Sequence, residues 1–462
     1  MSNVAGPAIR QGVGAFRPVV PLSIGTVLRD TLSCPYTWLV SILRISSRHL
    51  IDGTGASAKR DWALLVEDGV IVAVGPDASV PRPEHARVLD YPDGTALPGL
   101  IDDHVHLVIP RTSGSMLDAM QALDDDQLVV LGAASAERFL RAGVTTVFDC
   151  GARGQTAFRI RDAVNRGLVL GPRTLVSGRP ITPTGGHTWW WGGEADGVEG
   201  VRAAVIHLLD EEGADGIKMM ATGGYMTSTT TPSQAAYAPE VFAVAADEAH
   251  RRGRYITAHA HGVAGMRAAS EAGIDCLQHA SMIGADGTWR FDEQLARDMA
   301  ARGTRASMTM AQGIRVEREK GTHVDWRTAR PGDPLSIASW MADARQLHDA
   351  GVELVVGTDM TSIVDTDHGE ETILEIEAFV EIGYTPLEAI RAATSLAATN
   401  LRVDGVTGRL AAGLAADVLI VDGAPHRDIH DLRNGRLVLR AGRPVLPTPL
   451  APPPIRLPVL PA

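Results

Sequence analysis

The feature that most constrains this sequence is a regular alternation of short apolar runs with amphipathic stretches, from Pro98 to about residue 400. The amphipathic stretches repeat apolar residues at helical spacing, and one of them opens with Pro239 and closes with Gly253, as helices commonly do. This alternation indicates a parallel sheet, and eight repeats predict a (β/α)8 TIM barrel, with a doubly wound open sheet as the alternative. The eight predicted strands are Leu100–Leu107, Thr145–Asp149, Thr174–Ser177, Gly216–Met220, Tyr255–His261, Cys276–His279, Arg305–Met310 and Leu354–Thr358.

The segments on either side of this region have a different pattern, with short apolar runs separated by tight-turn residues such as Asp68-Gly69 and Asn434-Gly435. After the barrel, strands are expected at Gly408–Leu410, Asp417–Val421 and Gly435–Arg440. The prediction is an α/β protein: a TIM barrel with a small β-sandwich-like domain built from both chain ends. The predicted segments are an N-terminal extension (1–41), the first part of the β-domain (42–97), the barrel (98–400), the second part of the β-domain (401–445) and a proline-rich tail (446–462).

Composition excludes several classes of partner. The 462 residues carry a formal net charge of -12 with no basic stripe, so nucleic acid is not an expected partner. No apolar run is long enough to cross a membrane, and residues 1–41 do not read as a signal peptide. Three widely spaced cysteines argue against a disulfide framework and favour a reducing compartment, so we expect a cytoplasmic protein.

Polar residues end five of the eight predicted strands, where a TIM barrel places its active site. His104 and His106 are two positions apart, so on a strand they face the same side and can bind one metal ion. The fifth strand repeats this pattern with His259 and His261. Any one of these polar residues could be an ordinary core residue, but five strands that carry them together favour a metal site. The remaining members are Lys218, His279 and Asp359 on the fourth, sixth and eighth strands.

The residue types narrow the chemistry. Imidazole and carboxylate ligands suit zinc or a similar divalent ion. A lysine ammonium would repel such an ion, so Lys218 fits this group only if its charge is removed or inverted.

This pattern resembles the amidohydrolase superfamily, and within it the imidazolonepropionase-related branch that includes Xaa-Pro dipeptidases and ochratoxin-type amidases. The resemblance extends from about residue 42 to 445. It rests on the strand-end residues and on these stretches: Ile51-Asp52-Gly53-Thr54-Gly55, Thr184-Gly185-Gly186-His187, Ile217-Lys218-Met219-Met220-Ala221-Thr222-Gly223-Gly224, His259-Ala260-His261-Gly262, Leu277-Gln278-His279 and Gly413-Leu414-Ala415-Ala416-Asp417-Val418.

The resemblance implies a centre of two divalent metal ions, expected to be Zn2+. His104, His106 and Asp359 would hold the more buried ion. His259 and His279 would hold the other. Lys218, carboxylated by CO2, would bridge the two ions. His261 would then contact substrate or support the ligands, although the opposite assignment of His259 and His261 stays open.

Other candidate residues follow the strands. By resemblance, Tyr225 would contact a substrate carbonyl or carboxylate, and His187 and His368 would contribute to substrate binding. Trp189-Trp190-Trp191 could form an aromatic substrate wall or only cover the barrel rim. The role of Asp102, next to the first histidine pair, stays open.

The implied activity is hydrolysis of an amide-type C–N bond in a peptide, acyl amino acid or aryl amide, by a hydroxide activated at the binuclear centre. Asp359 would move the proton from the attacking water to the leaving nitrogen, and Tyr225 would stabilise the oxyanion. Carbamate, urea or lactone hydrolysis and mononuclear deamination are alternatives on the same scaffold. A catalytically silent binding barrel is the non-enzyme alternative. The expected partner is a small-molecule substrate, and the resemblance implies a homo-oligomer.

Overall fold

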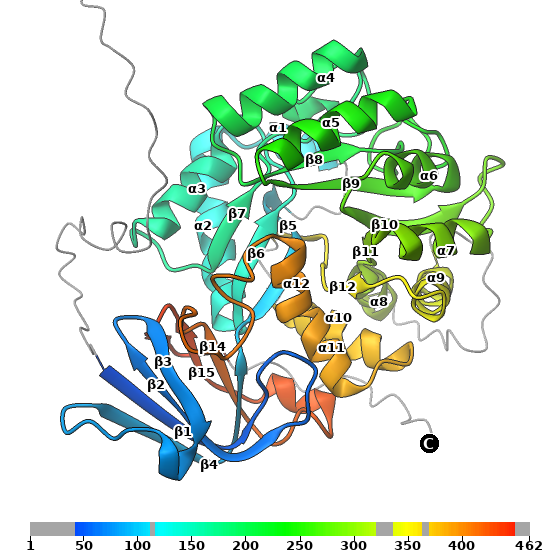
Figure 1. Cartoon of the computed structure of the whole chain (residues 1–462). Helices are drawn as coiled ribbons and strands as arrows, with labels where there is room; N and C mark the ends of the chain where they lie inside the picture. Colours follow the sequence, from blue (N-terminus) through cyan, green and yellow to red (C-terminus); the bar gives the residue numbers. More distant parts are fainter. Residues whose placement is uncertain (1–41, 111–115, 320–335, 363–368, 449–462) are drawn as a thin grey trace, which may run out of the picture. The chain divides into compact units, whose positions relative to one another are not determined.

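A mixed seven-stranded sheet is formed from both ends of the chain. The computed structural model describes residues 42–110, 116–319, 336–362 and 369–448 (Figure 1). The strands of this sheet run in the order β16-β15-β14-β4-β1-β2-β3, and all neighbours are antiparallel except β1 and β4. Their bounds are β1 (Ile42–Leu50), β2 (Lys59–Glu67), β3 (Val70–Pro76), β4 (Arg87–Pro98), β14 (Val418–Asp422), β15 (Gly435–Arg440) and β16 (Arg443–Val445).

Turn chemistry and an apolar cluster explain this sheet. Asp68 and Gly69 both have positive φ, the conformation that a tight two-residue hairpin requires between β2 and β3. Side chains from both chain ends, among them Ile45, Leu64 and Ile420, pack into one buried cluster. Because β4 pairs with β14, the strand that leads into the first histidine pair is anchored by the far end of the chain.

Two parallel sheets carry the strands that were predicted for the barrel. One has the order β13-β5-β6-β7 and the other the order β12-β11-β10-β9-β8. The bounds are β5 (Leu100–Pro110), β6 (Val144–Asp149), β7 (Arg173–Val176), β8 (Gly216–Met220), β9 (Tyr255–Gly262), β10 (Cys276–Ile283), β11 (Arg305–Ser307), β12 (Leu354–Val355) and β13 (Met360–Ser362).

Helices alternate with these strands along the chain (Figure 1). A capping box at Asp124 starts α2. The Asp124 side chain accepts a hydrogen bond from the Gln127 backbone amide, and the Gln127 side chain accepts one from the Asp124 backbone amide. The helices are α1 (Met116–Gln121), α2 (Asp125–Arg141), α3 (Thr156–Asn165), α4 (Gly197–Ile206), α5 (Pro239–Arg251), α6 (Val263–Glu271), α7 (Glu293–Arg302), α8 (Met310–Glu319), α9 (Ile337–Asp349), α10 (Glu370–Glu381), α11 (Pro386–Ala392) and α12 (Ser395–Asn400), with shorter turns η1 (Asp77–Ser79), η2 (Trp189–Trp191), η3 (His207–Glu211) and η4 (Ile429–Arg433).

Backbone hydrogen bonds join the two parallel sheets at both of their margins. Beyond β7, the Ile181 amide donates to the Lys218 carbonyl on β8 at 2.9 Å. At the other margin, the Asp103 amide donates to the Val356 carbonyl at 3.0 Å, and the Asp359 amide donates to the His104 carbonyl at 2.7 Å. The ends of β5, β8 and β12 are therefore held to their neighbours across the sheet margins.

All eight predicted barrel strands are confirmed as strands, seven of them with shifted ends and Gly216–Met220 with the ends predicted. Two other predictions are wrong. The sequence also predicts one last helix at Pro386–Ala398, but this stretch is not one helix, because the backbone at Thr394 departs from helical geometry between α11 and α12. Gly408–Leu410 is not a strand, because Gly408 adopts positive φ where the chain passes close to Gly53, and a Cβ on Gly53 would lie 2.6 Å from the Gly408 carbonyl oxygen. Within the described ranges, no helix is long and apolar enough to cross a membrane.

Candidate metal centre

The first donor cluster comprises His104, His106 and Asp359, and it forms where β5 meets the residues after β12. The Asp359 Oδ1 atom lies 3.3 Å from His104 Nε2 and 3.2 Å from His106 Nε2. Both histidines are buried, whereas the Asp359 side chain keeps 20% of its surface exposed. Asp359 also has positive φ, an uncommon conformation for a residue other than glycine. The structure thus brings together the three residues predicted to share the more buried ion.

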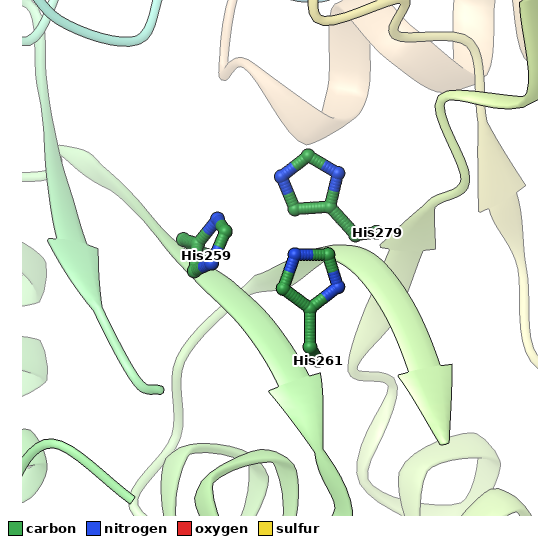
Figure 2. Close-up of side chains that lie close together, drawn as sticks. All are labelled: His259, His261 and His279. Carbon is green, nitrogen blue, oxygen red and sulfur yellow. The ribbon is translucent and has the colours of Figure 1, made fainter. Parts of the chain in front are cut away.

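The second donor cluster comprises His259 and His261 on β9 with His279 on β10 (Figure 2). All three are buried. Their candidate ligand atoms lie within 4.8 Å of one another. His279 has a φ of 71°, a strained backbone conformation of the kind that concentrates at functional sites. The rings of His104 and His279 are 5.2 Å apart between centroids, so the two clusters adjoin.

Lys218 lies on β8 beside these clusters. It is only 2% exposed, and its Nζ atom lies 3.2 Å from His104 Nε2. The whole sequence has three lysines among its 43 basic residues, so arginine is the usual cation of this chain. A buried primary amine among imidazoles is costly as an ammonium, but unlike a guanidinium it is readily modified. The position therefore fits a lysine whose charge is altered.

Hydrogen bonds fix which ring nitrogens remain available. His106 Nδ1 lies 3.0 Å from the Gly151 carbonyl oxygen, and His259 Nε2 lies 3.2 Å from the Gly223 carbonyl oxygen. Because a carbonyl only accepts, each of these nitrogens carries the proton and the other nitrogen keeps its lone pair. His279 Nδ1 pairs with the Thr309 hydroxyl at 3.0 Å. Such bonds commonly orient metal-binding imidazoles.

Burial also keeps the imidazoles neutral. Desolvation lowers the pKa of His104, His259 and His279 well below the ordinary value, and it lowers the pKa of His261 to about 3. Neutral imidazole is the form that binds metal ions. Clustered neutral imidazoles with a carboxylate form a donor set that suits zinc, so the residues present fit a divalent metal.

Asp102, whose role the sequence left open, ties the ligand-bearing strand ends together. Its buried carboxylate accepts the amides of His104 and Thr358 at 3.2 and 3.1 Å. It also accepts the hydroxyls of Thr358 and Thr372, each at 2.8 Å. Burial raises the pKa of Asp102 to about 7. This one side chain thereby links β5, the segment before Asp359 and helix α10.

Several supporting residues were missed by sequence reasoning. Asp103 accepts hydrogen bonds from Ser307 Oγ at 2.8 Å and Asn400 Nδ2 at 2.9 Å, which connects β5 to β11 and α12. Gly357 leaves room for this carboxylate, since a Cβ there would lie 2.1 Å from Asp103 Oδ1. Thr309, just beyond β11, orients His279. Its place near the end of the predicted strand Arg305–Met310 was the available signal.

The loops after β7 and β8 meet beside the centre. His187 is buried, its Nδ1 pairs with the Thr227 hydroxyl at 3.1 Å, and its ring centroid lies 4.6 Å from that of His259. Burial lowers the pKa of His187 to about 4. Tyr225 is 44% exposed, with its ring 5.1 Å from His261. His368 lies outside the described residues.

The three tryptophans of η2 were predicted either to form a substrate wall or only to cover the barrel rim, and they differ in their exposure. Trp191 is buried, and its ring centroid lies 5.2 Å from that of His106, so it packs against the first cluster. Trp189 is 39% exposed, with its ring 6.2 Å from Trp190. The innermost ring therefore belongs to the core, and the outermost is partly exposed to solvent.

The sequence matches the profile of the amidohydrolase family over residues 95–445. The chain belongs to that family. It is 30% identical to ochratoxinase from Aspergillus niger over 447 residues, covering 84% of this chain and 83% of the relative. It is 28% identical to imidazolonepropionase from Salinispora tropica over 385 residues, covering 79% of this chain and 87% of the relative.

Solved structures agree with this assignment. The crystal structure of a Xaa-Pro dipeptidase with bound methionine superposes with a TM-score of 0.74 at 26% identity, covering 88% of this chain and all of that one. That of A. niger ochratoxinase gives a TM-score of 0.73 at 28% identity, covering 87% of this chain and 95% of that one. These relatives confirm the amidohydrolase branch expected from the sequence. The protein is an amidohydrolase-family hydrolase acting on C–N bonds.

Proposed function

We propose that this amidohydrolase cleaves an amide-type C–N bond of a small peptide, acyl amino acid or aryl amide, with two divalent ions, Zn2+, at its centre. The observation that carries the proposal is the pair of adjoining donor clusters with the buried Lys218 beside them. When bound, the two ions supply Lewis-acid polarisation of the substrate carbonyl and a lowered pKa for water. The names of the relatives support the bond type, and the loops must select the substrate.

The architecture in this proposal is a closed (β/α)8 barrel. The hydrogen bonds at Ile181–Lys218 and Asp103–Val356 support closure, since they join the two parallel sheets at both margins. The division into a barrel at 98–400 and one β-domain at 42–97 and 401–445 belongs to the same proposal. The pairing of β4 with β14 supports it.

The ligand assignment follows the two clusters. His104, His106 and Asp359 would hold one ion, and His259 and His279 would hold the other. Lys218 would bridge them as a carbamate: its amine nitrogen bonds to the carbon of CO2 and loses one proton, which leaves an anion. The proximity of the amine to His104 supports a carbamate beside both clusters.

Proton movement in this proposal falls to Asp359. Its Oδ1 faces the first histidine pair, so Oδ2 is the oxygen that can accept a proton from the attacking water. The same carboxyl then delivers that proton to the leaving nitrogen. Tyr225 would donate its hydroxyl to the substrate oxygen, and His187 and His261 would contact the substrate around it.

The first test is metal content per chain, by elemental analysis of protein produced with zinc and bicarbonate. We expect about two ions per chain. About one ion would overturn the bridging role of Lys218 and favour a mononuclear deaminase. No ion, even after metal addition, would overturn the enzyme proposal and leave a binding scaffold. Dipeptides, N-acyl amino acids, aryl amides, carbamates, ureas and lactones, tested in parallel, identify the bond.

The Asp359→Asn variant tests the proton transfer. We expect kcat to fall by about 100-fold to 10,000-fold, because the amide cannot accept the water proton. Elemental analysis must accompany the kinetics, since Asp359 is also a proposed ligand. Full turnover by a metal-loaded variant would show that Asp359 is not the proton carrier.

The compartment, the oligomeric state and the partners of the protein also belong to the proposal. We propose a cytoplasmic homo-oligomer that acts on small molecules, without nucleic acid or membrane partners. Cys150 and Cys276 are buried free thiols, which supports a reducing compartment. Light scattering of the purified chain tests the oligomer: a mass of 49.0 kDa would mean a monomer.

A further inference from the structure

The second cluster has one more imidazole than the proposed ligand assignment uses. His259 and His261 alternate on β9 and so face the same side, toward His279 on the neighbouring β10 (Figure 2). The ring centroids of His259 and His261 are 4.6 Å apart, and each is 4.7 Å from that of His279. All three rings are buried. The His261 ring therefore lies as close to the rings of the two proposed ligands as these lie to each other.

Each ring has one nitrogen held by the protein and one left over. His261 Nδ1 pairs with Ser281 Oγ at 2.9 Å, which leaves Nε2. His279 Nδ1 pairs with Thr309 in the same way, and the bond from His259 Nε2 to Gly223 leaves Nδ1. Ligand atoms on one zinc ion are at most about 4.2 Å apart, since Zn–N bonds measure about 2.1 Å. One nitrogen from each of the three rings lies within 4.8 Å of the others, which is close to that spacing.

We infer that His261 is a third imidazole ligand of the second ion, so that His259, His261 and His279 can hold this ion even when Lys218 is not carboxylated. Three imidazoles are a complete protein ligand set for zinc. The inference rests on the proposed function only in that the centre takes divalent ions. It assigns His261 to the metal, and it separates loading of the second ion from carboxylation of Lys218.

His187 provides a matched comparison. It is another buried histidine, and its ring centroid is also 4.6 Å from that of His259. It comes from the loop after β7 and is not a member of the three-histidine cluster. A Cβ on Gly224 would lie 2.4 Å from its Nε2, so that nitrogen packs against backbone. Removing His187 disturbs the same surroundings without removing a proposed ligand.

The experiment isolates the second cluster. Lys218→Met removes the bridge and His106→Ala disables the first cluster, and the metal-free double variant is then titrated with Co2+. Visible absorption reports coordination, and competition with a chelator gives Kd. We expect one tightly bound ion. Adding His261→Ala should weaken its binding by about 100-fold or more and change the spectrum, whereas adding His187→Ala should leave both within about threefold.

Unchanged Co2+ affinity and spectrum after His261→Ala would overturn the inference and return His261 to substrate contact. Failure of the folded double variant to bind Co2+ would also overturn it, while a wild-type count of two ions would leave the proposed function standing. Circular dichroism checks folding. Where the double variant does not fold, the Lys218→Met background serves: His261→Ala must then lower the number of tightly bound ions by one, and His187→Ala must not.

Discussion

At the scale of single residues, Asp102 shows how a side chain that faces no ion can still set the geometry of the centre. Its carboxylate accepts the amides of His104 and Thr358 and the hydroxyl of Thr372. Asp102→Asn replaces an accepting oxygen with a donor, so at least one of these buried groups loses its partner. We expect a loss of about 1–3 kcal/mol in unfolding free energy and about 10-fold to 100-fold weaker metal binding, measured by denaturant titration and chelator competition.

A matched control for this prediction is Asp286→Asn. Asp286 also accepts bonds from a threonine, Thr288, but it lies on an exposed loop. Metal affinity should not change in this variant. If both variants weakened metal binding equally, the effect would come from general destabilisation and Asp102 would have no positioning role.

Lys218 leads to a prediction that depends on amine chemistry alone. Lys218→Arg keeps a long basic side chain, but its guanidinium stays protonated and would not replace the carbamate anion. We expect metal content to fall from about two ions to about one, because the guanidinium would lie beside His104 and displace the first ion, and kcat to fall by at least about 100-fold. In the wild type, 13C-labelled bicarbonate should give a carbamate resonance that the variant lacks. Retention of both ions and full activity by Lys218→Arg would contradict the bridge.

At the scale of elements, the turn η2 carries one tryptophan expected to stabilise the fold and one that is exposed and could contact substrate. Trp191 is buried against His106, so Trp191→Ala leaves a large cavity and should cost about 3–5 kcal/mol in unfolding free energy. Trp189 is exposed, so Trp189→Ala should change stability by less than about 0.5 kcal/mol. Thermal and denaturant unfolding compare the two. A raised KM for aryl amides in Trp189→Ala alone would place the substrate wall at Trp189.

The elements also show what the sequence could and could not predict. Strands such as β8 were found because a buried parallel strand needs a continuous apolar run, and the lone Lys218 was conspicuous within one. The break at Thr394 and the turn at Gly408 were missed because they depend on packing between distant segments. Hydrophobic periodicity describes one element at a time, so it cannot predict contacts between distant segments.

The same reasoning applies to the centre. The structure brings together His104, His106 and Asp359, which the family resemblance assigns to one ion. Strand alternation and the shared end of parallel strands predict only that these side chains lie near one another. The place of His261 beside His259 and His279 depends on side-chain orientation, which spacing does not determine. Thr309 and Ser281 were missed because a hydroxyl that orients an imidazole has no sequence pattern of its own.

At the scale of the whole molecule, a charged network attaches the C-terminal segment to α10, the helix that also supplies Thr372 to Asp102. Arg433 of η4 donates to Glu377 of α10 at 2.6 and 2.7 Å, and His430 Nδ1 lies 2.9 Å from the same carboxylate. Although burial raises the pKa of Glu377, the bonds from His430 and Arg433 hold it below its ordinary value. The attachment is therefore sensitive to the charge of His430.

The pH dependence of this network follows from the hydrogen bond to Glu377, which raises the pKa of His430 in the folded state. The unfolded state thus loses this proton first as pH rises, so the stabilisation is complete below about pH 6.5 and declines as pH passes through the higher folded pKa. His430→Asn should cost about 0.5 kcal/mol at pH 5.5 and less at pH 8.5, the figure being small because the side chain is partly exposed. Denaturant unfolding of both proteins across this range gives the difference, in which the other titrating groups largely cancel. If the difference in unfolding free energy between the two proteins grew with pH, neutral His430 would make the stabilising contact. Arg433 alone would then supply the positive charge that lowers the pKa of Glu377.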